Sequence, residues 1–331
     1  MLMKQPILRI EDLSVRYPVY KGFLQRQVAQ IKAVEKVTLT LKRGEAFGLV
    51  GESGCGKTTL ARTVLRLVNA TEGSIWFEGE NITNLDGAAL APYRKRVAAV
   101  FQDPFSSLNP RMRAGNIIAE VLGVHGFEGD AKCRVIELFD LCGLSERFFD
   151  LYPHQMSGGQ RQRVGIARAL AIEPDLIVCD EAVSALDVSI QAQIINLLEE
   201  LRVRLNLTYL FIGHDLSIVR HLCDRVAVMY LGRVVEVANS EELFSKPQHP
   251  YTRALIEAVP NPDPKSEVTR EFVALNGEVP SPLNPPTGCV FHPRCPIAIN
   301  KCCSLEPTIT NSQSGHDVAC HAFTLLPKDE K

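Results

Sequence analysis

The 331-residue chain lacks the features that mark membrane-spanning, exported or nucleic-acid-binding proteins. No apolar run is long enough to cross a bilayer, and the run from Val226 to Leu231 is typical of the longest. Residues 1–6 are not followed by the apolar core of a signal peptide, so nothing indicates export. The net charge of −2 leaves no basic surplus, and we therefore expect no nucleic-acid partner. Any role at a membrane would have to come through a partner protein.

The composition is otherwise that of an ordinary soluble globular protein, with 46% hydrophobic and 22% charged residues. The length suits one large domain with an appendage, or two domains. Cysteine is abundant, with ten residues. Five are scattered singly and are expected to be small buried apolar residues: Cys55, Cys133, Cys142, Cys179 and Cys223. Five others crowd the last stretch and need a separate explanation: Cys289, Cys295, Cys302, Cys303 and Cys320.

A glycine-rich stretch at residues 51–58 organises the rest of the chain. It has the G-x-x-x-x-G-K-T pattern of a phosphate-binding P-loop. An apolar run at 46–50 predicts a buried strand before it, and helical spacing over 59–68 predicts a helix after it. Backbone N–H groups and a helix N-terminus can then surround phosphate oxygens. We expect Lys57 to reach the β- and γ-phosphates and Thr58 to bind Mg²⁺. The alternative is a chance glycine turn followed by a lysine, which would not need a strand before it and a helix after it.

Three further predicted buried strands end in polar side chains: Gln102 after residues 97–101, Asp180 and Glu181 after 176–179, and His214 after 207–212. Ligands of parallel α/β sheets collect outside the carboxyl ends of the strands. Asp180 is expected to hold Mg²⁺, and Glu181 to polarise an attacking water as general base. The alternative for the two acids is a pair of surface carboxylates. A lone histidine is more often structural than catalytic, but His214 shares the strand-end position of the others.

A second helix N-terminus suited to an anion is predicted at Ser157. Ser157 is a good N-cap, Gln160 stands at the capping-box position, and residues 164–170 continue a helix. Gly158 and Gly159 stand at the front of this helix, which makes its N-terminus a natural anion site. One chain has no obvious use for two γ-phosphate sites per nucleotide. The pattern therefore points to an arrangement of two chains.

The N-terminal part predicts two strands, at 7–17 and 31–41, joined by a polar loop at 18–30. Tyr17, at the end of the first strand, could stack on an adenine or simply pack an edge. The apolar stripe of residues 190–205 predicts a helix that faces the core.

Residues 114–150 predict a helical insertion that is interrupted by a glycine-rich turn at 123–129. The loop at 103–112 is either a binding surface or packed on itself. Its apolar residues are Phe105, Leu108 and Met112. Residues 226–230 and 234–237 read as a terminal hairpin.

Together these motifs resemble the ATP-binding subunit of an ABC transporter over residues 7–258. The resemblance implies an α/β P-loop NTPase with a RecA-like core, an antiparallel β subdomain and an α-helical signature subdomain at about 103–172. Residues 1–258 would form this nucleotide-binding domain. The residues that the resemblance assigns to ATP are Tyr17, Gly51, Ser53, Gly54, Cys55, Gly56, Lys57, Thr58 and Thr59.

The same resemblance gives roles to the other motifs. Gln102, Glu181 and His214 match the Q-loop, the catalytic base and the switch histidine, and Asp187 matches the D-loop. Thr58, Gln102 and Asp180 are the implied Mg²⁺ ligands. Two such domains meet head to tail in this family, so the signature would complete the ATP site of a second chain: Ser157, Gly158, Gly159 and Gln160.

Three positions depart from the family pattern. Met156 replaces the usual leucine, Ala182 the usual proline, and Gly213 the usual serine or threonine. None of these changes removes a functional group, so we expect a complete, hydrolysing half-site. Gln102 and the loop at 103–112 are expected to pass the conformational change to a permease.

The C-terminal residues narrow the resemblance. Segments 249–255 and 277–286 look like the oligopeptide/dipeptide branch, which also includes nickel, glutathione and opine importers. This implies ATP-driven import of peptides or related solutes at the cytoplasmic face of a bacterial inner membrane. The implied partners are a second, different ATPase chain, two membrane permeases and, indirectly, a periplasmic or extracellular solute-binding protein. The alternatives are a soluble ABC ATPase, a P-loop kinase, and a cluster-carrying interaction protein with a vestigial cassette.

Residues 259–331 are expected to form a small irregular extension around a cysteine cluster. Its ligands would be Cys289, Cys295, Cys302 and Cys320. Their spacing contains no C-x2-C pair, which is weak evidence for zinc, and the cytosol disfavours disulfides. Four thiolates suit a [4Fe–4S] cluster, which the resembling importer branch carries; zinc or oxidised cysteines are the alternatives. Cys303 is expected to be spare, and the nearby histidines that could ligate instead are His292, His316 and His321.

Overall fold

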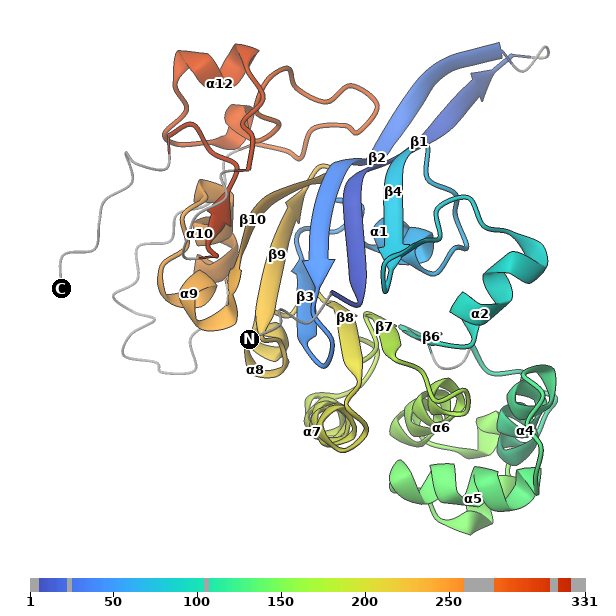
Figure 1. Cartoon of the computed structure of the whole chain (residues 1–331). Helices are drawn as coiled ribbons and strands as arrows, with labels where there is room; N and C mark the ends of the chain where they lie inside the picture. Colours follow the sequence, from blue (N-terminus) through green and yellow to red (C-terminus); the bar gives the residue numbers. More distant parts are fainter. Residues whose placement is uncertain (1–5, 23–25, 104–106, 259–276, 310–314, 323–331) are drawn as a thin grey trace, which may run out of the picture.

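The computed structural model describes residues 6–22, 26–103, 107–258, 277–309 and 315–322. Figure 1 shows two β-sheets with helices around them. The strands are β1 (Leu8–Lys21), β2 (Arg26–Leu41), β3 (Ala46–Val50), β4 (Glu72–Phe77), β5 (Glu80–Asn81), β6 (Val97–Phe101), β7 (Leu176–Asp180), β8 (Thr208–Ile212), β9 (Arg225–Tyr230), β10 (Arg233–Asn239) and β11 (Asp317–Val318).

Helices connect and cover these strands. The α-helices are α1 (Lys57–Val64), α2 (Ala91–Arg94), α4 (Ala114–Val124), α5 (Ala131–Leu141), α6 (Gly158–Leu170), α7 (Val188–Leu205), α8 (Leu216–Leu222), α9 (Ser240–Ser245), α10 (Pro250–Glu257) and α12 (Asn300–Ser304). The 3-10 turns are η1 (Gly87–Leu90), η2 (Glu146–Asp150), η3 (Pro153–Gln155) and η4 (His292–Arg294).

The larger sheet has the strand order β11-β10-β9-β3-β8-β7-β6. Its strands from β9 to β6 are parallel, as expected for the core of a P-loop protein. Phe47 and Leu49 of β3 belong to one hydrophobic core, whereas Ala46 and Val50 belong to the other. Because both faces of this sheet are buried, its strands are continuous apolar runs. This is why their positions could be predicted from the sequence.

The smaller sheet is antiparallel, with the order β2-β1-β4-β5. The polar loop predicted at 18–30 is wrong for most of its length, because β1 continues to Lys21 and β2 begins at Arg26. The two strands pair from Pro18 and Gln30 to Lys21 and Arg26. Their side chains there are mostly exposed, so the backbone ladder forms without the apolar alternation that would have indicated strands.

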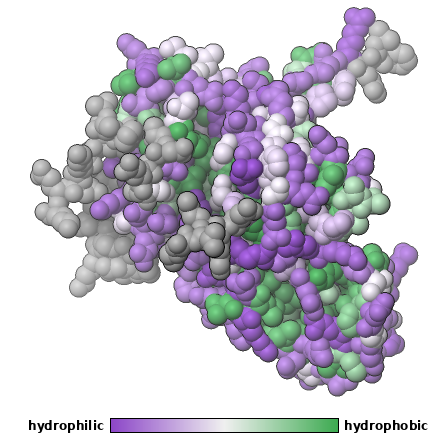
Figure 2. Space-filling model, in the orientation of Figure 1, coloured by the Kyte–Doolittle hydropathy of each residue, from purple (hydrophilic) through white to green (hydrophobic). Residues whose placement is uncertain are grey.

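A helical lobe formed by α4, α5 and α6 follows β6, as predicted for 114–150 (Figure 1). Leu108 is buried in the hydrophobic core and Met112 packs against it, so these two side chains do not form an exposed binding surface. Phe105 lies outside the described residues. Figure 2 shows apolar side chains gathered over this lobe, where Val124 and Phe127 are exposed.

The segments 277–309 and 315–322, called the C-terminal extension below, fold back onto the rest of the chain. The predicted terminal hairpin of β9 and β10 gains a third strand, because β11 pairs with β10 through Glu236 and Val318. The N–H of Lys32 in β2 also donates to the carbonyl of Pro282 at 3.2 Å. Within the described ranges, no helix has the length and apolar character that a membrane crossing requires.

Four of the five scattered cysteines are buried as predicted, but Cys133 is exposed. Cys133 stands in the first turn of α5, and its thiol donates to Asp130, the N-cap of that helix, at 3.3 Å. The bonded carboxylate raises the pKa of the Cys133 thiol. A helix start facing solvent therefore explains its exposure.

Candidate functional site

The strand order brings the predicted strand-end residues to one edge of the larger sheet. β3, β8, β7 and β6 are successive neighbours. Ile212 stands level with Leu49 on one side and with Asp180 on the other, and Phe101 stands level with Asp180. The residues that follow these positions therefore leave the sheet side by side.

The P-loop depends on glycine at two positions. Gly51 has φ 151°, and a Cβ there would lie 2.1 Å from the carbonyl oxygen of Met229 in β9. Gly56 has φ 109°, and its Cβ would lie 2.1 Å from the carbonyl oxygen of Ala33 in β2. Any larger residue would push the loop away from both strands. Gly56 also caps α1 without a side-chain hydrogen bond, which leaves this helix N-terminus available to an anion.

Lys57 lies inside the loop. Its Nζ donates to the carbonyl oxygen of Gly51 at 2.7 Å and to that of Glu52 at 3.0 Å. The side chain of Cys55 lies beside it, with 3.7 Å between Sγ and Nζ. Burial raises the pKa of the Cys55 thiol despite this ammonium. The loop therefore holds one buried positive charge where phosphate groups would arrive.

Thr58 and Asp180 form the pair expected to bind Mg²⁺. The hydroxyl of Thr58 donates to Oδ1 of Asp180 at 3.3 Å. Two neighbouring ligands of an octahedral Mg²⁺ stand about 3 Å apart, so this pair of hard oxygen atoms fits the ion. Burial raises the pKa of Asp180, and the hydrogen bond from Thr58 opposes that shift. Gln102 follows β6 beside them and is exposed.

Glu181 and His214 face each other at the next position along the edge. Oε2 of Glu181 lies 3.6 Å from Nδ1 of His214, and the side chains are 22% and 60% exposed. Glu181 has φ 50°, an uncommon value for this residue type, and its N–H donates to the carbonyl of Ile212 at 2.9 Å. A cavity of about 40 Å³ beside these side chains has room for a water molecule. The arrangement can therefore hold a water between a carboxylate and an imidazole.

The second predicted anion site has the expected cap. The N–H of Gln160 donates to Oγ of Ser157 at 3.3 Å, and the N–H of Ser157 donates to Oε1 of Gln160 at 2.9 Å. This confirms the capping box. α6 packs on α4, α5 and α7 and also on β6, whereas α1 packs on β2, β7 and β8. The signature residues thus belong to the helical lobe, and the P-loop belongs to the sheets.

Two other predicted residues have clear positions. Tyr17 pairs with Ile31 in the antiparallel sheet and is 37% exposed, so its ring is accessible. Asp187 is the N-cap of α7 and accepts a hydrogen bond from the N–H of Ile190 at 3.0 Å. This bond lowers the pKa of Asp187.

The cysteine segment does not form a metal site in the described structure. No three His, Cys, Asp or Glu side chains of the described residues are arranged to hold a metal ion. Burial, together with the charges of Cys302 and Cys320, raises the pKa of Cys289 to about 11. Burial also raises the pKa of Cys295. Cys303 is exposed.

The three histidines near this segment have other partners. Nδ1 of His292 lies 2.9 Å from the carbonyl oxygen of Cys289, and Nε2 of His321 lies 2.9 Å from that of Leu305. His316 contacts Glu236 at 2.7 Å. A four-sulfur donor set would suit a [4Fe–4S] cluster, but no three of these thiols in the described residues are arranged to hold a metal ion.

Sequence reasoning missed the contact between Glu52 in the P-loop and Arg294 in the extension. The two residues stand 242 positions apart. Glu52 is a variable position of the P-loop pattern, and Arg294 is one of many arginines. No spacing or periodicity could have paired them.

Two family models match the sequence. The ABC transporter model matches residues 34–184, and the model of the oligopeptide/dipeptide transporter C-terminal region matches residues 235–302. The chain is 50% identical over 324 residues to the oligopeptide transport ATP-binding protein AppF of Bacillus subtilis, covering 97% of this chain and 98% of the relative. It is also 50% identical to the probable peptide ABC transporter ATP-binding protein y4tS of Sinorhizobium fredii, covering 96% and 90%.

Solved structures show the same fold. One is the dimeric, post-hydrolysis ATP-binding cassette MJ0796 bound to ADP and phosphate, with 28% identity and a TM-score of 0.63 over 70% of this chain and 98% of that one. Another is cbiO1 of Clostridium perfringens, part of the ABC transporter complex cbiONQ, with 28% identity and a TM-score of 0.63 over 73% and 92%.

Proposed function

The chain belongs to the oligopeptide/dipeptide family of ABC transporter ATP-binding proteins, and we propose that it hydrolyses ATP to drive the import of peptides. The observation that carries this proposal is that five side chains lie in neighbouring positions at one edge of the larger sheet. They are the P-loop lysine Lys57, the hydrogen-bonded pair Thr58 and Asp180, and the carboxylate–imidazole pair Glu181 and His214.

The proposed chemistry is the transfer of the γ-phosphoryl group of ATP to water. Lys57 and the P-loop N–H groups bind the β- and γ-phosphates. Thr58 and Asp180, with Gln102, would hold Mg²⁺, which would supply positive charge to neutralise the phosphates. Glu181 accepts a proton from the water while the water oxygen bonds to the γ-phosphorus. The bond between the γ-phosphorus and the oxygen that bridges it to the β-phosphate breaks, and ADP leaves. His214 orients Glu181 and the water. Tyr17 stacks on the adenine.

We propose that Ser157 to Gln160 bind the nucleotide of a second, homologous ATPase chain, with Asp187 at the same interface. A helix N-terminus whose first residues are glycines can bind an anion, and it lies on a different lobe from the P-loop. The proposed assembly adds two membrane permeases and, indirectly, a periplasmic or extracellular solute-binding protein. The chain would then lie at the cytoplasmic face of a bacterial inner membrane. A soluble ATPase without permeases is not favoured by the relatives.

We further propose that residues 1–258 are the nucleotide-binding domain and 259–331 its extension. The support is that the elements carrying all the nucleotide-site residues precede residue 258. We also propose that Cys289, Cys295, Cys302 and Cys320 bind a [4Fe–4S] cluster, on the chemistry of four thiols in one small segment. This requires the thiols to come closer together than they lie in the structure.

The test is to express the chain with its partner ATPase and permeases, and to purify the complex. Glu181→Gln should lower the turnover of ATP about 10²- to 10⁴-fold, because a general base contributes that much. ATP binding should be retained. Glu199→Gln, on α7 away from the site, is the matched control and should hydrolyse normally.

Iron and acid-labile sulfide should be measured on the same complex. Near wild-type turnover by Glu181→Gln would place the base elsewhere, and purification without permeases would favour the soluble alternative. A complex without iron or sulfide would overturn the cluster but not the ATPase.

A further inference from the structure

The C-terminal extension reaches the P-loop through an ion pair whose arginine is buried. Arg294, in η4, donates from Nη1 to Oε2 of Glu52 at 2.8 Å and from Nη2 to Oε1 at 3.1 Å. Two parallel bonds give an arginine–carboxylate pair both strength and a defined orientation. The Arg294 side chain is 7% exposed and that of Glu52 is 25% exposed. The pair is therefore shielded from the solvent that weakens most surface ion pairs.

Glu52 is part of the loop that surrounds the phosphate position. Its N–H donates to Oη of Tyr251 at 2.8 Å, and its carbonyl accepts from Nζ of Lys57 at 3.0 Å. Arg294, Tyr251 and Lys57 thus hold the side chain, the N–H and the carbonyl of one residue. A shift of Glu52 would move a carbonyl group that orients the Lys57 ammonium.

A buried aromatic cluster holds Arg294 in place. The ring of Phe291, three residues earlier, lies 5.2 Å from that of Tyr230 and 5.5 Å from that of Tyr251. Nη1 of Arg294 also lies 3.4 Å from Oη of Tyr230. Because Phe291 is fully buried and aromatic pairs at such separations are attractive, the segment 291–294 has a defined position.

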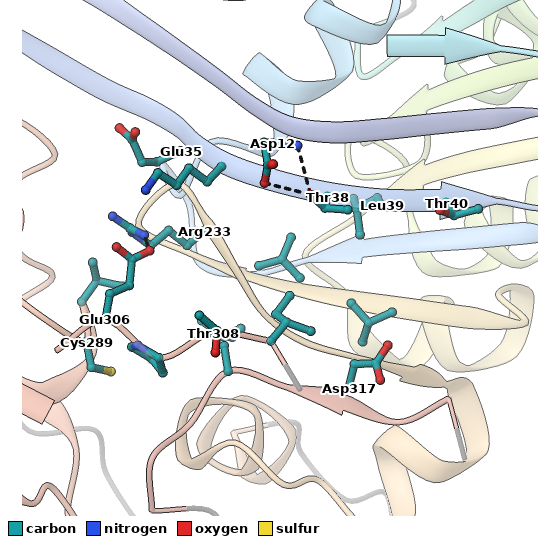
Figure 3. A pocket seen from close by; sticks show the side chains of 18 of the residues that line it. Asp12, Glu35, Thr38, Leu39, Thr40, Arg233, Cys289, Glu306, Thr308 and Asp317 are labelled. Carbon is teal, nitrogen blue, oxygen red and sulfur yellow. Dashed lines mark hydrogen bonds and ion pairs between the residues drawn. The ribbon is translucent and has the colours of Figure 1, made fainter. Parts of the chain in front are cut away.

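Part of the extension stands apart from the sheets, although β11 pairs with β10. A cavity of about 650 Å³ lies between β2, β10 and the extension residues 288–290 and 306–309 (Figure 3). Arg233 of β10 and Glu306 pair at this cavity. The extension is therefore joined to the rest of the chain by separate local contacts. The Arg294–Glu52 pair involves the P-loop, and the Arg233–Glu306 pair does not.

We propose that Arg294 is a positioning residue of the nucleotide site. By holding Glu52, it keeps the P-loop carbonyls and the Lys57 ammonium in the arrangement that receives the β- and γ-phosphates. The C-terminal extension thereby sets the affinity for ATP, so it is part of the support of the nucleotide site. The inference rests on the proposed ATPase function and adds a residue that no motif contains.

The test measures the Kd of a fluorescent ATP analogue and the turnover at saturating ATP, using the full chain with its partner ATPase. Arg294→Gln and Glu52→Gln should each raise the Kd about 10- to 100-fold and change turnover much less, as expected when a binding group is misplaced. The double variant should match the single ones, because both changes remove one contact. Arg294→Lys keeps the charge but loses the two parallel hydrogen bonds of the guanidinium. Its Kd should lie between that of the wild type and that of Arg294→Gln.

The matched control is Arg233→Gln, which breaks an ion pair between the extension and β10 in which no P-loop residue takes part. It should leave the Kd unchanged. A folded Arg294→Gln that binds like wild type, additive effects in the double variant, or an equal loss in Arg233→Gln would overturn the proposal.

If Arg294→Gln does not fold, the test rests on Glu52→Gln alone. The Glu52 side chain is partly exposed, so its replacement disturbs the fold less. If the wild-type complex fails to bind ATP, the proposed function fails. If the wild type binds ATP and these variants bind it equally well, the inference fails by itself.

Discussion

Burial governs the ionisation of His249, which stands two residues before Tyr251, the acceptor of the hydrogen bond from the N–H of Glu52. His249 is buried at the N-cap of α10, where its Nδ1 accepts a hydrogen bond from the N–H of Tyr251 at 3.1 Å. Burial lowers the pKa of His249 to about 4, and the nearby charge of Glu236 partly opposes this shift. A proton on Nδ1 would also abolish the cap. The folded chain therefore requires a neutral His249.

We predict that the protein loses stability between pH 6.5 and pH 4 through this residue. In this range the unfolded chain binds a proton at His249 and the folded chain does not, so the free energy of unfolding falls as pH falls. The loss approaches about 1.4 kcal/mol per pH unit. Urea unfolding at several pH values measures it. His249→Asn keeps a capping side chain without titrating, and should flatten the slope.

The exposed His154 supplies the control. His154→Asn should leave the pH dependence as in the wild type. An unchanged slope in His249→Asn would show that another group is responsible.

At the scale of elements, two helices approach closely at the signature. A Cβ on Gly159 of α6 would lie 2.6 Å from Cγ2 of Ile190 in α7, and one on Gly158 would lie 3.2 Å from Cδ2 of Leu186. Gly165 of the same helix has no neighbouring atom within 4 Å of such a Cβ. The second signature glycine thus has a packing reason in addition to its predicted role toward an anion.

We predict that Gly159→Ala destabilises the fold by about 1–3 kcal/mol, because the added methyl overpacks the contact between α6 and α7. Gly165→Ala should instead gain up to about 1 kcal/mol, since alanine is the better helix former and space is available. Thermal unfolding of both variants compares them directly. Equal stability of the two would contradict the packing explanation.

At the scale of the whole molecule, a ring of four alternating charges ties the two sheets together. Arg43 lies between β2 and β3, Glu78 follows β4, Arg96 precedes β6, and Asp175 precedes β7. Arg43 contacts both acids, and Arg96 lies 2.5 Å from Glu78 and 2.6 Å from Asp175. Burial by itself would raise the pKa of Asp175. The hydrogen bonds from Arg43 and Arg96 lower this pKa by more, so that it lies below its usual range.

We predict that Asp175→Asn costs about 1–3 kcal/mol of stability, because it removes two charge-assisted hydrogen bonds from one ring. The loss should shrink at high salt, where the remaining charges are screened. Asp150→Asn is the control: Asp150 is 71% exposed and pairs with a single arginine, and such a pair contributes about 0–1 kcal/mol. Denaturant unfolding at low and high salt measures the stability of both variants. An equal loss of stability in Asp175→Asn and Asp150→Asn would contradict the prediction.

Some elements have local causes and could be predicted from the sequence alone. The P-loop pattern, the buried strands at 46–50 and 176–179, and the capping box at Ser157 were predictable, because apolar runs, glycine positions and caps act within a few residues. Because the carboxyl ends of parallel strands meet at one edge of a sheet, their polar ends were predictable as one site as well.

Other features depend on residues that lie far apart in the chain, and only the folded structure shows them. Pairing of β1 with β2 beyond Tyr17 needs only a backbone ladder, so exposed polar residues form it without a pattern. Leu108 is buried in a core cluster to which residues far along the chain contribute. Glu52 and Arg294 meet only because the extension folds back over 242 positions. Such contacts depend on how the packed elements lie in space, and no local spacing of residue types records that.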